Sequence, residues 1–200
     1  MEIGKQSSSA QEDATLIQAF REGDRNAFDK LVLNHKNRIF NLCYRFLGDY
    51  QEANDTAQET FISAYRSLKR FRFESAFSTW LYRIAVNTCR NKLKSSGYRK
   101  KMVTVSMDNP LPAQGANPSV DIPDESRSPA VEFEKKERLT YIKDAISRLP
   151  RDQREAVILR DINGFSYDEI SEITGLNLGT VKSRIARARQ GLREMLKGVI

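Results

Sequence analysis

The sequence predicts an all-α fold made of two small helical domains joined by a flexible linker. Apolar residues recur at intervals of three and four along most of the 200-residue chain, which is the period of amphipathic helices. The N-terminal half contains no stretch with the pattern of a strand. Five of the six prolines, at positions 110, 112, 118, 123 and 129, interrupt the helical pattern between its two blocks. We therefore expect domains over residues 12–95 and 131–200, with a flexible, acidic, Pro-rich linker over 96–130.

Four helices are expected in the first domain, after a polar, Ser-rich tail over residues 1–11 that we expect to be disordered. The Gly-Asp pairs at 23–24 and 48–49 are expected to end the first and second helices. A third helix is expected over about 51–68, and a fourth begins near Ser75 or Ser78 and runs to about Leu93. Short turns between these helices predict a compact bundle.

The second domain is expected to contain four helices, over about 131–148, 152–160, 166–174 and 178–196. Leu149-Pro150 ends the first of them. Ser166 and Glu169 have the spacing of a capping box, which marks the start of a helix. Gly175 supplies the turn before the last helix.

The last expected helix has an apolar stripe on one face and basic residues on the other. Its apolar residues alternate at spacings of four and three, so they are expected to pack on the domain. They are Val181, Ile185, Ala188, Leu192 and Met195. A short helix, a Gly turn and a basic helix in that order predict a helix-turn-helix whose last helix enters a DNA major groove. The alternative is an amphipathic helix with a solvated basic face. The residues expected to contact DNA are Thr180, Lys182, Ser183, Arg184, Arg187 and Arg189.

Composition favours a polyanion as partner and gives no sign of catalysis. The formal net charge is +7, and charged residues make up 30% of the chain. No phosphate-binding loop, metal-ligand cluster or nucleophile–base motif is present, so we expect no enzyme activity, no cofactor and no metal. Cys43 and Cys89 lie on apolar helix faces and are expected to be reduced and buried. Without a signal core or a long apolar stretch, the protein is expected in the cytoplasm.

The segment from Arg70 to Lys94 is dense in aromatic and basic residues. Aromatic rings offer faces on which unstacked bases can lie, and cations hold phosphates, which is the chemistry of opened DNA. Phe77, Trp80 and Ile84 share one helical face and could equally be core. Phe71, Arg72 and Phe73 lie in the expected loop and are better candidates for base contact.

Two long stretches resemble the sigma-70 family of bacterial RNA polymerase sigma factors. Region 2 of that family is similar to EANDTAQETFISAYRSLKRF, followed by the aromatic loop and TWLYRIAVN. Region 4 is similar to LPRDQREAVILRDINGFSYDEISEITGLNLGTVKSRIARAR. The small extracytoplasmic-function group, which is RpoE-like, fits best. Family members often have Gly and Asp where this chain has Phe73 and Glu74.

The resemblance implies a factor that binds core RNA polymerase and directs promoter-specific initiation of transcription, for a stress or envelope response. Region 4 would read the −35 element as duplex and contact the β flap, and region 2 would read and open the −10 element. The residues implied at −10 are Arg70, Phe71, Arg72, Phe73, Ser75, Trp80, Arg83, Asn87 and Arg90. The residues implied on the β′ clamp helices are Asp49, Glu52, Asp55, Gln58 and Glu59, although on the sequence alone a solvated polar face is the favoured explanation.

The resemblance also implies a further partner, and rival functions remain open. An anti-sigma factor is expected, which could hold the protein at the inner membrane. The acidic linker either enters the RNA path of the polymerase or is a plain spacer. The main alternative is a stand-alone helix-turn-helix regulator that binds duplex DNA without polymerase, and an enzyme acting on nucleic acid is a more distant one.

Overall fold

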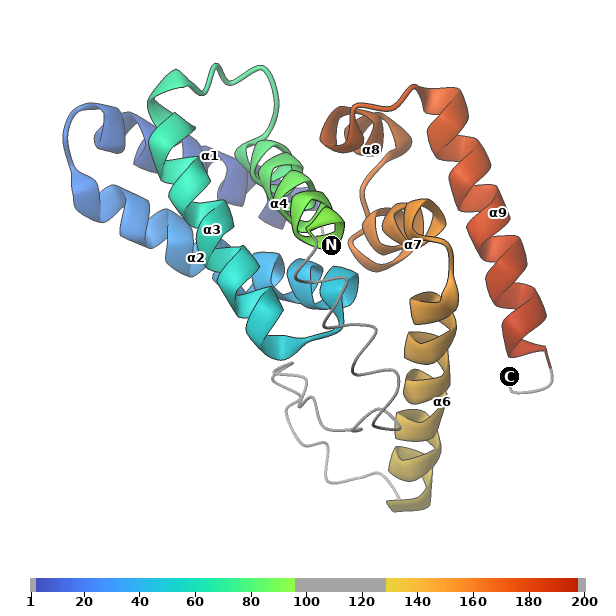
Figure 1. Ribbon diagram of the computed structural model, residues 1–200. Helices are drawn as coiled ribbons and strands as arrows, with labels where there is room; N and C mark the ends of the chain where they lie inside the picture. The colour runs from blue at the N-terminus through green and yellow to red at the C-terminus, as the bar shows by residue number, and fades with distance from the viewer. Residues whose placement is uncertain (1–2, 96–128, 198–200) are drawn as a thin grey trace. The chain divides into compact units, whose positions relative to one another are not determined.

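The computed structural model describes residues 3–95 and 129–197. All of its regular elements in these ranges are helical, which confirms the all-α class (Figure 1). They fall into two compact units. One unit contains α1–α4 and the segment Asp168–Leu176, and the other contains α6, α7, η2 and α9. The expected linker falls almost wholly outside the described residues, and the domain boundaries stay a prediction.

The first unit is a bundle whose helices end where local turn signals place them. Its elements are α1 (Ile3–Arg21), α2 (Arg25–Leu47), α3 (Tyr50–Ser67), the 3₁₀ turn η1 (Leu68–Arg70) and α4 (Phe77–Lys94). Gly48 takes the left-handed conformation with φ 75°, which glycine adopts without steric cost. Its N–H donates to the carbonyl of Tyr44 at 2.8 Å, and the Asp49 side chain then accepts from the N–H of Glu52 at 2.9 Å. The expected end of the second helix at Gly48-Asp49 is confirmed.

The beginning of the chain differs from expectation, because α1 extends back to Ile3 where the sequence predicts a disordered tail over 1–11. Helix growth from an existing turn costs little, since each added residue gains one backbone hydrogen bond. No proline interrupts the chain before Arg21. The buried residues Asp13, Ile17 and Phe20 anchor the helix farther along, and its polar N-terminal turns continue from them.

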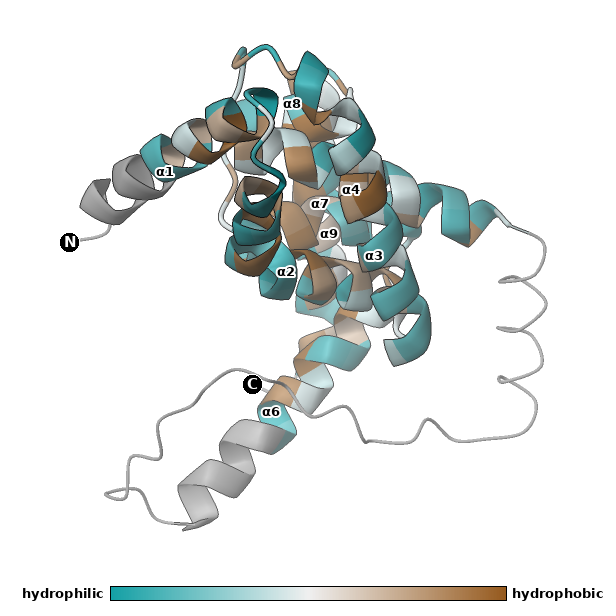
Figure 2. Cartoon of the chain, turned by 90° about the vertical axis from the view of Figure 1, so that its left-hand side faces the viewer, coloured by the Kyte–Doolittle hydropathy of each residue, from teal (hydrophilic) through white to brown (hydrophobic). Residues whose placement is uncertain are grey.

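The core of the bundle is formed by the apolar faces of its four helices. Figure 2 shows that α2, α3 and α4 each carry both hydrophobic and hydrophilic residues. Leu31, Ile39, Leu68 and Leu81 are almost fully buried. Cys43 and Cys89 are also buried and are not joined in a disulfide, which confirms the expectation of reduced thiols.

A hydrogen-bonded polar pair lies inside this core. The Nε2 atom of His35 on α2 lies 3.0 Å from each carboxylate oxygen of Asp13 on α1. Both residues are buried, and the ring of His35 meets the edge of the Phe77 ring at a centroid distance of 5.3 Å. A polar group taken out of water is costly unless it has such a hydrogen-bond partner. The pair therefore fixes α1 on α2 in one position.

The second unit packs α9 (Leu178–Leu196) on α6 (Pro129–Arg148) and α7 (Arg151–Val157). Leu149, Val157 and Ala188 form a buried apolar cluster. Beyond α7 the chain continues as the π-helical turn η2 (Ile158–Ile162), so the helix expected to end at residue 160 reaches two residues farther. Met195, at the end of the expected apolar stripe, is 37% exposed, whereas Val181, Ile185 and Ala188 of the same stripe are buried.

The remaining helix, α8 (Tyr167–Thr174), has eight residues and begins one residue after the start of the expected range 166–174. Gly175 follows with φ 71°, and α9 begins three residues later. The expected order of short helix, Gly turn and basic helix is confirmed. No helix in the described ranges has the length and apolar composition that crossing a bilayer requires.

The buried pair makes a testable prediction. Asp13→Ala leaves His35 without its partner, and we expect it to lower the stability of the first unit by about 3 kcal/mol. Urea unfolding followed by the fluorescence of Trp80, the single tryptophan, reports on this unit. Glu12→Ala, at an exposed position of the same helix, is the matched control and should change stability by less than about 0.5 kcal/mol. Equal effects of the two variants would contradict a structural role for the pair.

Candidate nucleic-acid interface

The basic face of α9 is presented by a well-capped helix. The side-chain oxygen of Asn177 accepts the N–H of Thr180 at 2.8 Å, which starts the helix. Val181, Ile185 and Ala188 are buried, so the opposite face must point outward. That face carries the expected residues Lys182, Ser183, Arg187 and Arg189, all of which are exposed. Thr180 and Arg184 are half-buried at its border.

Two of the arginines expected to contact DNA are held by acids of the same unit. Arg189 binds Asp161 through two contacts, Nε to Oδ2 at 3.1 Å and Nη2 to Oδ1 at 2.5 Å. The Nε atom of Arg184 lies 3.5 Å from Oδ2 of Asp152. The hydrogen bond from Arg189 to Asp161, together with the negative charge of that carboxylate, raises the pKa of Arg189. Lys182 and Arg187 have no such acid among the described residues, so they are the cations most available to a polyanion.

The turn before α9 is braced by a serine. The Ser171 hydroxyl donates to the carbonyl of Leu176, and the N–H of Gly175 donates to the carbonyl of Ser171 at 2.9 Å. The second bond satisfies a carbonyl in the last turn of α8, and the first satisfies a carbonyl of the turn that follows. Ser171 therefore helps to hold the turn that leads into the basic helix.

The loop between η1 and α4 divides its two phenylalanines between core and surface. Phe71 is 4% exposed, and its ring centroid lies 5.1 Å from that of Trp80 and 6.0 Å from that of Phe77. The ring of Phe71 is therefore packed among other aromatic rings, and its contact with a base stays a prediction. Phe73 is 44% exposed and has φ 56°, a conformation that costs a non-glycine residue energy.

The other residues expected at an opened strand have varied exposure. On the loop and η1, Arg70 and Arg72 are exposed and Ser75 is half-buried. On α4, Trp80 and Arg90 are half-buried, whereas Arg83 and Asn87 are exposed. The Nη1 atom of Arg90 lies 3.5 Å from the side-chain oxygen of Asn87. Trp80 packs partly in the core, as the alternative reading of that helix face allows.

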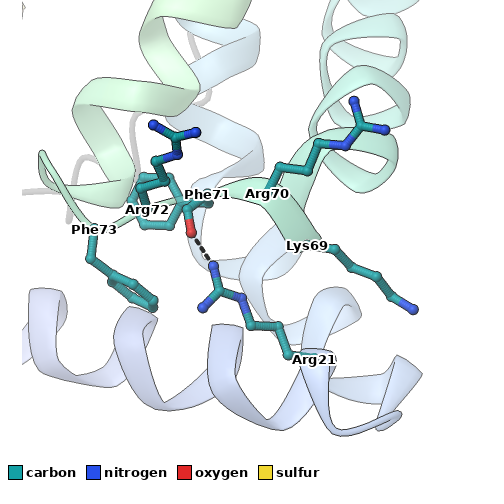
Figure 3. A pocket seen from close by; sticks show the side chains of 6 residues that line it. All are labelled: Arg21, Lys69, Arg70, Phe71, Arg72 and Phe73. Carbon is teal, nitrogen blue, oxygen red and sulfur yellow. Dashed lines mark hydrogen bonds between the residues drawn. The ribbon is translucent and has the colours of Figure 1, made fainter.

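A cationic hollow of about 540 Å³ lies beside this loop. Arg21, Lys69, Arg70, Phe71, Arg72 and Phe73 line it. Figure 3 shows Arg21 rising from α1 between Phe73 on one side and Lys69 on the other. Its guanidinium donates to the carbonyl of Phe71 and lies 5.0 Å from the centroid of the Phe73 ring. Arg21 was not expected from the sequence, because a contact across 50 residues leaves no local pattern.

The expected acidic face of α3 has less free charge than its sequence indicates. Asp49 caps the helix, and Glu52 pairs with Lys92 on α4 at 2.7 Å. Asp55, Gln58 and Glu59 are exposed, and the carboxylate of Asp55 accepts from the Gln51 side chain at 3.1 Å. Within the described residues, no group of three or more His, Cys, Asp or Glu side chains could hold a metal ion.

Comparison with known proteins covers both units. The family model described as "Sigma-70 region 2" matches residues 31–98, and "Sigma-70, region 4" matches residues 139–192. The RNA polymerase sigma-H factor of Pseudomonas aeruginosa is 40% identical over 190 residues, which are 95% of this chain and 96% of that protein. The ECF RNA polymerase sigma-E factor of Haemophilus influenzae is 37% identical over 185 residues, with 92% and 95% covered.

Two solved structures are also similar. CnrH, solved with the cytosolic domain of CnrY, has a TM-score of 0.65 and 25% identity, over 93% of this chain and 97% of that one. RpoE of Bartonella quintana, solved with the anti-sigma factor NepR, has a TM-score of 0.62 and 27% identity, over 86% and 97%.

The division of the loop between core and surface can be tested by stability. Phe71→Ala removes a ring from the aromatic cluster, and we expect a loss of about 3–5 kcal/mol from the first unit. Phe73→Ala, at the exposed position two residues on, should cost only about 0.5–2 kcal/mol, the contribution of its cation–π contact with Arg21. Urea unfolding followed by far-UV circular dichroism measures both changes. A loss at Phe73 as large as that at Phe71 would contradict the assignment.

Proposed function

Because the chain belongs to the extracytoplasmic-function group of the sigma-70 family, the sigma factors of RNA polymerase, we propose that it binds core polymerase and selects promoters at their −35 and −10 elements. One observation carries the proposal. A single chain combines a basic helix shaped for a major groove with a separate cationic and aromatic hollow suited to an unpaired strand.

The −35 element is the proposed partner of α9. Lys182, Ser183 and Arg187 are exposed on its outward face and carry the donors that read base edges. Thr180 is half-buried and lies in the first turn of α9, and a helix N-terminus is a site where phosphates bind. Arg184 and Arg189 reach DNA only by exchanging their carboxylate partners for phosphates, so we assign them to the backbone.

The −10 element is the proposed partner of the loop after η1 and of the start of α4. A base taken out of its stack costs a few kcal/mol, which a pocket must offset. Stacking on an aromatic ring contributes about 1–3 kcal/mol per base. Phe73 offers an exposed ring for this contact. In the proposal, the path of the strand is surrounded by Arg70, Arg72, Ser75, Arg83, Asn87 and Arg90. Trp80 supports the loop from beneath through Phe71.

Separate protein partners are assigned to the first and the second unit. The exposed residues Asp55, Gln58 and Glu59 of α3 are the proposed contact with the β′ clamp helices, joined at its border by Glu52 and Asp49. The second unit is assigned to the β flap. An anti-sigma factor is a further proposed partner, because two similar proteins, CnrH and RpoE, were solved with protein partners. In this proposal the factor acts in the cytoplasm, and the polymerase performs all of the chemistry.

Reconstituted transcription tests the proposal. Purified core polymerase, incubated with the protein and a library of promoter fragments from the source genome, should initiate at a defined set of start sites. Core polymerase alone is the control and should not use those sites. Promoter-dependent binding by the isolated protein, with no initiation when polymerase is added, would favour the stand-alone regulator instead.

The assignment of α9 makes a sharper prediction. Arg187→Ala should weaken holoenzyme binding to a −35 duplex fragment on the order of tenfold, because one base-reading arginine contributes about 1–3 kcal/mol. Arg193→Ala removes the same charge from an exposed position nearer the end of α9 and serves as the matched control. Fluorescence anisotropy with labelled duplex measures both. Equal losses would mean that α9 contributes charge without reading sequence.

A further inference from the structure

The hollow beside the loop carries an unusual concentration of positive charge. Four of its six lining residues are cations, namely Arg21, Lys69, Arg70 and Arg72, and none is an acid. Lys69 and Arg70 are exposed and have no ion-pair partner among the described residues. Arg72 lies 3.8 Å from Glu74, but both side chains are more than three-quarters exposed, so water screens this pair strongly. Like charges gathered without counter-charges repel one another, and a bound anion relieves that repulsion.

Arg21 differs from the other three cations because its place is fixed. It reaches the hollow from α1, donates to the carbonyl of Phe71 and lies against the ring of Phe73. Its Nε atom is buried and has no hydrogen-bond partner in the structure. A buried donor without a partner is costly, so an acceptor supplied from outside would be favoured. A guanidinium also has donors enough to keep the Phe71 carbonyl while binding a second acceptor.

We infer that this hollow is a phosphate-binding subsite for the opened promoter strand and that Arg21, from α1, is one of its ligands. The inference rests on the proposed function. It extends the proposed −10 site to α1, because the −10 residues named so far lie between residues 70 and 90. A single strand fits better than duplex because the exposed ring of Phe73 lies beside the cations. The ring takes an unstacked base, and the cations hold the phosphate next to it.

The salt dependence of strand binding tests this subsite in the holoenzyme. The probe is a fluorescein-labelled oligonucleotide with the non-template strand of a promoter that the wild-type holoenzyme transcribes. Each phosphate contact with a single strand contributes about −0.7 to the slope of log affinity against log salt. Arg21→Gln should make that slope shallower by about 0.7 and weaken binding on the order of tenfold. Arg25→Gln, which removes an exposed cation at the start of α2 and outside the hollow, should leave the slope unchanged.

A conservative variant separates phosphate binding from support of the loop. Arg21→Lys keeps the charge but cannot both hold the Phe71 carbonyl and cover the Phe73 ring, so it should retain the slope and lose only part of the affinity. A slope in Arg21→Lys as shallow as that of Arg21→Gln would overturn the inference, because it would assign Arg21 to the loop alone. Urea unfolding followed by Trp80 fluorescence checks that both variants fold.

Chemically altered strands locate the contact. A methylphosphonate that neutralises one phosphate at a time should weaken wild-type binding at one position near the captured base. In Arg21→Gln the same replacement should weaken binding less than in the wild type, because one ligand of that phosphate is already missing, and such non-additivity is the signature of a direct contact. Equal loss at that position in both proteins, or an equal loss of affinity for duplex in Arg21→Gln, would overturn the subsite. If the wild-type holoenzyme initiates normally in either case, the proposed function stands and the subsite alone fails.

Discussion

The buried pair between Asp13 and His35 determines where the first unit places its cationic hollow. The pair fixes α1 on α2, and Arg21 follows Asp13 on the same helix by two turns, or about 12 Å. The His35 ring also meets Phe77, whose ring contacts both Phe71 and Trp80. One polar contact in an apolar core therefore sets the position of the arginine and of the aromatic cluster beneath the loop. A purely apolar contact would permit sliding of α1 more readily, because hydrophobic burial is not directional.

The two units manage positive charge in opposite ways. In the second unit, Asp152 and Asp161 hold two of the arginines on α9, and the bidentate geometry at Arg189 restricts its side chain to one orientation. In the hollow of the first unit, Lys69 and Arg70 lie exposed without acids. A duplex presents a regular backbone, so a few pre-oriented cations and exposed base-reading groups suffice for it. An opened strand has no fixed shape, and exposed cations on long side chains can hold it in several positions.

Local signals explain why much of the fold could be predicted from the sequence. Gly48-Asp49 ends one helix and caps the next with contacts between residues at most four apart, and Gly175 likewise precedes α9. Contacts between distant residues were not predictable. The burial of Phe71 depends on α4, the role of Arg21 on a contact across 50 residues, and the pairing of Arg189 on Asp161 at a separation of 28. The first and third of these contacts change the interpretation of Phe71 and Arg189, which the sequence had assigned to DNA. The second identifies Arg21, which the sequence had not singled out.

Phe73 shows how the loop can respond to a strand. A left-handed backbone costs an L-residue about 1–2 kcal/mol, and a cation over an aromatic ring returns about 0.5–2 kcal/mol. The contact with Arg21 therefore roughly offsets the strain. The Phe73 ring is held by a contact weak enough to be exchanged for another. A base that stacks on this ring, and a phosphate that engages Arg21, would use the same two side chains. In the proposed subsite, Arg21 and Phe73 already support the strained loop, so binding a strand would need a change of partners at these two side chains and no rebuilding of the backbone.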